Sequence, residues 1–197
     1  MTRAANPFDW SGGHPALDFV NTLDERPLPS PIEHLASYDA LVRFTELAGL
    51  IEPAAARRLR SLDRVGGARV ARRARELRER LFAVLTAIHA QRPAPPDALD
   101  AISLEVRKAH AARTLVAKGA GAITRRWSRS DAPETPLLAC ALAIEELLLS
   151  ADHARIRKCA AHDCAVYFID TSKAHRRQWC SMGNCGNREK QRRWRAQ

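Results

Sequence analysis

A chain of 197 residues, 46% apolar and 27% charged, is long enough for one ordinary domain plus a small second one and is not disordered by composition. It opens without the apolar run of a signal peptide, and its longest apolar run, residues 137–144, is far shorter than the about 20 residues that span a bilayer, so we expect a cytoplasmic protein without membrane contact. The formal charge of +10 is concentrated in residues 151–197, which hold 11 Lys and Arg against 4 Asp and Glu; this indicates either a polyanionic partner or a solubilising tail.

Apolar residues recur at spacings of three and four over much of the first 111 residues, which predicts amphipathic helices. Ser37 is a suitable N-cap for one of them, and the proline-rich residues 92–96 separate the last two. The first segment also fits a buried strand, but we favour a helix. The expected helices cover residues 15–23, 37–50, a short stretch from 53, 68–90 and 97–110.

The segment from Arg113 to Arg129 departs from the helical pattern. Two β-prone runs, residues 115–117 and 122–124, flank a turn that contains two glycines, which predicts a β-hairpin. Thr135 then opens a strongly apolar helix. The first 153 residues are therefore expected to form a mostly helical α+β domain with one β-hairpin.

Four of the five cysteines fall within 27 residues in the pattern C-x4-C-x15-C-x4-C. Tetrahedral zinc takes four soft ligands, and two short loops with two thiolates each can supply them. Because no export signal is present, disulfides or free thiols are the weaker interpretation. The sequence predicts one structural zinc ion held by Cys159, Cys164, Cys180 and Cys185.

The rest of the tail is expected to form a short hairpin around the zinc site and a basic helix that begins at Cys185 and ends near residue 195. Arginine suits a nucleic-acid surface, because its planar fork binds phosphate or guanine bidentately. Trp179 and Trp194 can stack on bases or pack against the metal site, and we favour packing. The predicted nucleic-acid-binding residues are Lys173, Arg176, Arg177, Arg188, Lys190, Arg192, Arg193 and Arg195.

A polar set near the N-terminus, Asp18, Asn21 and Arg26, lies among apolar residues and is a candidate ligand pocket. The alternative is that these side chains cap or turn the backbone. The sequence has no nucleophile elbow, phosphate loop or metal-binding histidine pair, so we do not expect an enzyme.

Two stretches resemble known families. The tail is similar to the CGNR zinc finger, named for the tetrapeptide that stands here as residues 185–188; the cysteine pair before it, the aromatic strand ending at Asp170 and the Trp-Cys-Ser-Met at residues 179–182 also match. Residues 13–22, GHPALDFVNT, resemble the opening of the ABATE domain, which usually precedes this finger.

The resemblance implies a bacterial, stress-induced transcription regulator with an ABATE-like domain over residues 1–153 and a small, treble-clef-like zinc finger over residues 154–197. DNA is the expected partner, with localisation to the nucleoid when bound and a small-molecule effector sensed by the first domain. A single finger reads few bases, so a homodimer is also expected. The alternative is a zinc-bearing module that binds RNA or protein without reading DNA sequence.

Overall fold

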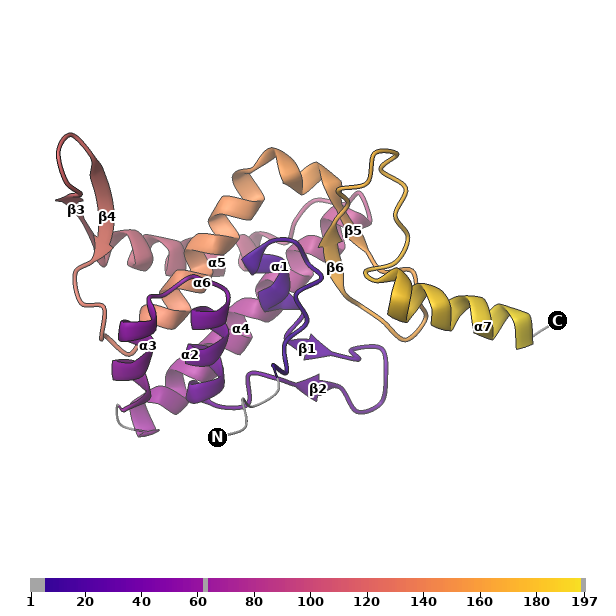
Figure 1. The fold of residues 1–197 in the computed structure, drawn as a ribbon, viewed down its shortest axis with the longest axis horizontal. Helices are drawn as coiled ribbons and strands as arrows, with labels where there is room; N and C mark the ends of the chain where they lie inside the picture. The colour runs from indigo at the N-terminus through magenta and orange to yellow at the C-terminus, as the bar shows by residue number, and fades with distance from the viewer. Residues whose placement is uncertain (1–5, 62–63, 196–197) are drawn as a thin grey trace. The chain divides into compact units, whose positions relative to one another are not determined.

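The computed structural model describes residues 6–61 and 64–195, and its ribbon is shown in Figure 1. The structure is mostly helical, as the sequence predicts, and the described residues form three small antiparallel sheets of two strands each. Two of these sheets are the predicted hairpins; the third, formed by residues 23–24 and 32–33, was not predicted. The helices are α1 (Pro15–Val20), α2 (Tyr38–Leu47), α3 (Pro53–Arg60), α4 (Arg64–His89), α5 (Pro96–Ala111), α6 (Thr135–Leu149) and α7 (Asn187–Arg195). The strands are β1 (Leu23–Asp24), β2 (Ile32–Glu33), β3 (Arg113–Ala117), β4 (Ile123–Trp127), β5 (Ile156–Lys158) and β6 (Tyr167–Ile169), and two short turns, η1 (Ala151–Arg155) and η2 (Met182–Gly186), complete the elements.

The expected helices are confirmed with small shifts at their ends. Residues 15–20 form the helix α1 rather than a strand, and Ser37 caps α2 by accepting a hydrogen bond from the amide of Ala40 at 3.1 Å. The helix α2 ends at Leu47, three residues before the predicted end. Among the described residues, no helix is both long and apolar enough to cross a membrane.

The chain divides into two compact units, and the division does not follow chain order. One unit runs from Leu35 to Glu146. The other combines the residues up to His34 with those from Leu147 onward. The predicted boundary between residues 153 and 154 is a boundary along the sequence, whereas these compact units group the described residues up to His34 with the tail.

The unit from Leu35 to Glu146 contains α2 to α5, the β3–β4 hairpin and most of α6. Its apolar side chains meet between α2, α3 and α6, where Tyr38, Leu50 and Trp127 pack against a buried cluster. That cluster consists of Val42, Ile51, Ala56, Leu59 and Ala139. Cys140 on α6 is fully buried, and burial raises the pKa of its thiol, so it is the structural thiol that the sequence predicts.

The second unit is built around the β5–β6 sheet, in which Arg157 pairs with Phe168. The outer edge of β6 is covered by the N-terminal segment. The Gly12 carbonyl accepts a hydrogen bond from the Ile169 amide at 2.9 Å, and the Asn21 side chain bonds both the amide (3.0 Å) and the carbonyl (2.9 Å) of Tyr167. Asn21 therefore replaces a neighbouring strand, which leaves these buried backbone groups paired.

Candidate metal centre

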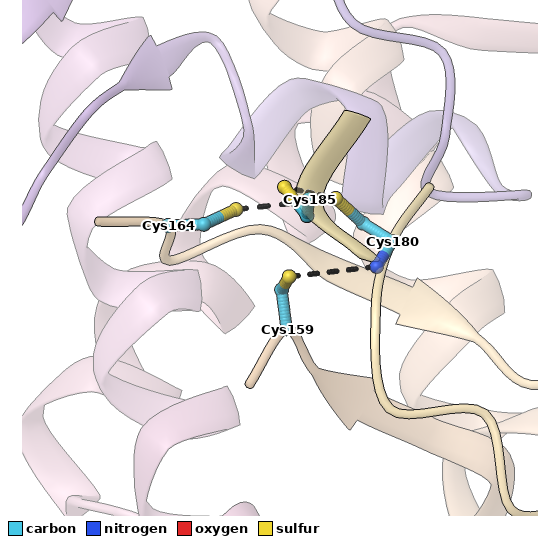
Figure 2. A group of neighbouring side chains, drawn as sticks. All are labelled: Cys159, Cys164, Cys180 and Cys185. Carbon is cyan, nitrogen blue, oxygen red and sulfur yellow. Dashed lines mark hydrogen bonds between the residues drawn. The ribbon is translucent and has the colours of Figure 1, made fainter. Parts of the chain in front are cut away.

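The four predicted ligands converge in the second unit. Figure 2 shows the side chains of Cys159, Cys164, Cys180 and Cys185 directed toward one another, and all four Sγ atoms lie within 4.8 Å of each other. Each cysteine is at most 8% exposed. The sequence prediction of which cysteines gather, and of Cys140 lying apart from them, agrees with this arrangement.

The spacing of the sulfur atoms fits a metal and excludes disulfides in this structure. The Sγ atom of Cys180 lies 3.9 Å from that of Cys164 and 3.6 Å from that of Cys185. Zinc–sulfur bonds of about 2.3 Å in a tetrahedron put sulfurs roughly 3.8 Å apart, whereas a disulfide needs about 2.05 Å. The cluster is suited to binding one zinc ion through four thiolates, which would crosslink two loops and the start of α7.

Backbone hydrogen bonds hold the first two cysteines in place. The Cys159 amide donates to the Val166 carbonyl at 2.9 Å, directly after β5, and the Cys164 amide donates to Ala161 in a tight turn at 3.2 Å. Cys185 was predicted to begin the final helix. It lies in η2, a π-helical turn that ends at Gly186, and α7 begins at the next residue. A Cβ atom at Gly186 would lie 2.5 Å from the sulfur of Met182, so a larger residue there would require the flexible Met182 side chain to move.

Thiol ionisation links metal binding to pH. A hydrogen bond with Cys159 raises the pKa of the Cys164 thiol to about 12, and burial raises the pKa of Cys185. Both shifts favour the protonated thiols. Since zinc binds thiolates, zinc uptake must release protons.

Arg177, a predicted nucleic-acid residue, is used inside the unit. Its guanidinium lies over the Phe168 ring, 4.6 Å from the centroid, and donates hydrogen bonds to the carbonyls of Trp179 at 2.9 Å and of Cys180. Trp179 packs against the cysteine cluster, as predicted. The side chain thus fixes the loop that carries Cys180.

Arg188 and Arg192 also make internal ion pairs. Arg188 lies 2.8 Å from an Asp163 oxygen and 3.4 Å from the Cys185 sulfur, while Arg192 bonds Glu189 at 2.8 Å. A zinc ion with four thiolates has a net charge of −2, and Arg188 is placed to offset part of it.

The sequence analysis missed the two acidic partners, Asp163 and Glu189. Glu189 is 3% exposed, accepts hydrogen bonds from Arg192 and His162, and these bonds hold the pKa of its carboxyl at about 2. The spacing of Glu189 and Arg192, three residues apart on a helix, is a signal that was available. The pairing of Asp163 with Arg188 was not, because 25 residues separate them.

The remaining predicted nucleic-acid residues are exposed, as are the side chains of Arg188 and Arg192 beyond their paired groups. Trp194 is 79% exposed, so the favoured packing role is wrong for this residue. It is the one apolar residue of α7, and the helix therefore has no apolar stripe to bury. The exposed members of the predicted set that form no ion pair within the described part of the unit are Lys173, Arg176, Lys190, Arg193 and Arg195.

The candidate pocket residues of the N-terminal segment bond to the backbone. Asp18 accepts a hydrogen bond from the Gly12 amide at 3.0 Å, Asn21 holds Tyr167, and Arg26 donates to the Val20 carbonyl at 3.3 Å. A cavity of about 490 Å³ does lie beside the metal centre, within the same unit. Its lining includes Asp9, Glu25, Asp163, Cys185 and Arg188 rather than these three residues.

Asp18 makes stability depend on pH. Burial raises the pKa of its carboxyl from 3.8 to about 7, against the opposing effect of the Gly12 hydrogen bond. The folded chain then keeps a proton that the unfolded chain releases between about pH 4 and 7, so stability falls as pH rises through that window. Asp18→Asn keeps an oxygen acceptor without the charge, and we expect its free energy of unfolding relative to wild type to rise by roughly 2 kcal/mol between pH 5.5 and 8.

Urea denaturation of the zinc-loaded protein at pH 5.5, 7 and 8 measures this difference. The matched control is Asp100→Asn, the same change at an exposed position on α5, which should follow the wild-type pH profile. Parallel profiles for Asp18→Asn and wild type would show that Asp18 is ionised in the folded protein throughout this range.

Comparison with family models gives two matches. The model of ABATE, described as a putative stress-induced transcription regulator, matches residues 13–151, and the model of the CGNR zinc finger matches residues 155–197. No curated protein sequence matches the chain. The first match contains Asn21, which bonds the backbone of β6, and the second contains all four cysteines of the metal centre.

Proposed function

The chain belongs to the ABATE family and carries a CGNR zinc finger, and from this we propose that it is a zinc-dependent, DNA-binding transcription regulator of the bacterial stress-response type. The observation that carries the proposal is the exposed surface of α7, on which Lys190, Arg193 and Arg195 surround the exposed Trp194. Exposed arginines and lysines neutralise phosphates and release counterions, so they supply affinity for DNA.

Zinc binding would fix the position of the N-terminal end of α7. The cluster joins the loop before β6 to the turn from which α7 begins, through Cys164 and Cys185. A helix of nine residues is marginal on its own in water, so its presentation depends on that crosslink. DNA binding should therefore require the metal.

The experiment is a selection of bound sequences from random DNA duplexes with the intact zinc-loaded protein. We expect a sequence motif to be enriched, and the combined change Lys190→Ala, Arg193→Ala and Arg195→Ala to weaken binding at least about tenfold and to lower the salt slope by roughly 2 to 3. Binding isotherms at several salt concentrations give both quantities.

The matched control removes three exposed arginines from the other unit: Arg57→Ala, Arg69→Ala and Arg72→Ala on α3 and α4. It lowers the net charge equally and should leave the motif and most of the affinity intact. An equal loss of DNA affinity in both variants would mean that α7 contributes only general positive charge. If no sequence motif is enriched, the proposal of a sequence-reading regulator is refuted.

RNA is the second candidate, and the exposure of Trp194 favours it. An aromatic ring at 79% exposure between arginines suits stacking on unpaired bases, which proteins use mainly on single-stranded RNA. In this case single-stranded RNA would compete with duplex DNA at equal or lower concentration, and Trp194→Ala would weaken RNA binding most.

An effector and a homodimer also belong to the proposal. The cavity beside the metal centre has room for a small molecule and is lined by Arg188, which contacts the Cys185 sulfur. A ligand there would act on the base of α7. A second copy of the chain would add a second reading head, as useful operator affinity requires.

A further inference from the structure

The outer half of the β3–β4 hairpin in the Leu35–Glu146 unit is exposed to solvent. Its strands pair antiparallel from Arg113 with Trp127 to Ala117 with Ile123, and the turn beyond them contains Gly119 and Gly121, both in the left-handed region. Figure 1 shows the hairpin projecting away from the helices of its unit. A two-stranded sheet by itself is only marginally stable. Because the exposed half of the hairpin adds little to the stability of the unit, we expect a binding role for it.

The outer half of the hairpin exposes large apolar side chains. Leu115 is 70% exposed and Ile123 is 74% exposed, on opposite strands. Alternation along the paired strands puts both on one face, together with Ala117 and Arg125. On this face Leu115 lies directly opposite Arg125, and Ala117 lies opposite Ile123 nearer the turn.

The hairpin is also purely cationic. Residues 113–129 hold five Lys and Arg and no Asp or Glu. Within the described part of the chain, no acidic side chain pairs with Lys118, Arg125 or Arg126, all of which are exposed. Their charges are therefore available to an external anion.

The base of the hairpin is firmly held, so the exposed part is presented at a defined place. Trp127 packs against the buried cluster of the unit, and Arg113 lies 5.5 Å from the centroid of its ring. His110 on α5 joins the hairpin to α6, with its Nε2 atom 2.7 Å from Glu145 and its Nδ1 atom 3.2 Å from Arg125. A cavity of about 310 Å³ opens at this base, lined by His110, Arg113, Thr114, Leu115 and Arg125.

We propose that the β3–β4 hairpin is a second DNA-contacting surface of this chain, a β-ribbon that enters a groove of duplex DNA. The proposal rests on the DNA binding proposed above. The major groove of B-DNA admits a two-stranded ribbon, and apolar side chains there contact thymine methyl groups. Lys118, Arg125 and Arg126 would then contact the flanking phosphates, while Leu115 and Ile123 face the base edges.

Charge decides for DNA over an ordinary protein partner. Residues 113–129 hold five cations and no acidic residue, and DNA interfaces are much more positively charged than protein interfaces. The hairpin also supplies the additional reading surface that one finger lacks, from the same chain.

The test measures DNA affinity and its salt dependence with the intact zinc-loaded protein and the duplex enriched by the selection. The variant Lys118→Ala, Arg125→Ala and Arg126→Ala is expected to lower the salt slope by roughly 2 to 3 and to weaken binding at least about tenfold. The variant Leu115→Ser with Ile123→Ser removes no charge, so it is expected to weaken binding several-fold with an unchanged slope. The Arg57, Arg69 and Arg72 alanine variant is the control for charge.

The outcomes separate this inference from the proposed function. If the wild-type protein binds DNA and the hairpin charge variant keeps the wild-type salt slope and DNA affinity, the hairpin does not contact DNA. The proposed regulator function is then unaffected. If wild type binds no duplex, the proposed function fails, and the hairpin has no role in DNA binding. If Leu115→Ser with Ile123→Ser leaves DNA affinity unchanged but lowers the molecular mass in sedimentation, the hairpin joins two copies of the chain and the inference is overturned.

Discussion

Replacing Cys185 with serine is expected to remove the bound zinc and with it DNA binding. A serine hydroxyl is a poor zinc ligand. With only three thiolates, one coordination position is open to water, so the zinc ion dissociates more readily. Apparent zinc affinities of structural sites correspond to about 10 to 16 kcal/mol of folding free energy. Because Val166, Phe168 and Trp179 pack directly against the cysteines, we expect the segment from β5 to α7 to lose its cooperative structure while α2 to α5 stay folded.

Zinc content by elemental analysis and hydrogen exchange of individual amides measure the two parts of this expectation. The control is Cys140→Ser, the same exchange at a fully buried thiol of α6. It should lower stability by about 1 to 3 kcal/mol through an unsatisfied hydroxyl and keep one zinc ion per chain. A Cys185→Ser protein with full zinc content and undiminished protection of β6 would contradict the four-cysteine centre.

Asn21→Ala is expected to destabilise the unit that contains the metal centre by about 2 to 5 kcal/mol. The change leaves the amide and the carbonyl of Tyr167 without their partners, and each buried unsatisfied group costs about 1 to 3 kcal/mol. Both residues are buried, Asn21 at 4% and Tyr167 at 0% exposure, so water cannot easily replace the lost bonds. We also expect faster loss of zinc to a chelator, because β6 follows directly on the loop with Cys164.

Chemical denaturation and the rate of zinc transfer to a colorimetric chelator test this prediction. Asn184→Ala makes the same chemical change at an exposed position near the cysteines and should shift stability by less than about 0.5 kcal/mol. Equal behaviour of the two variants would mean that the N-terminal segment does not support the metal centre.

Local patterns predicted most of the elements correctly. Apolar periodicity located α2 to α6, the glycine turn located the β3–β4 hairpin, and the repeated cysteine spacing identified the metal ligands. These features depend on residues that are near in sequence or on a metal with fixed ligand chemistry. The sequence therefore contains them directly.

The features that were missed depend on contacts between distant residues. Asn21 fits the edge of β6 across 146 residues, and Asp163 neutralises Arg188 across 25. Asn21 and Asp18 were assigned to a candidate pocket because polar residues among apolar ones fit both a ligand site and a backbone contact. Only the fold shows which buried backbone groups need them.

The covering of β6 by the N-terminal segment has a consequence during protein synthesis. Asn21 leaves the ribosome 146 residues before its partner Tyr167, and at rates of about 5 to 20 residues per second the interval is about 7 to 30 s. In that time the apolar residues Leu17, Phe19 and Val20, which are buried in the finished fold, have no strand to pack against. The nascent chain therefore offers a chaperone an apolar target until the tail is made, and a cell short of zinc would prolong this exposure.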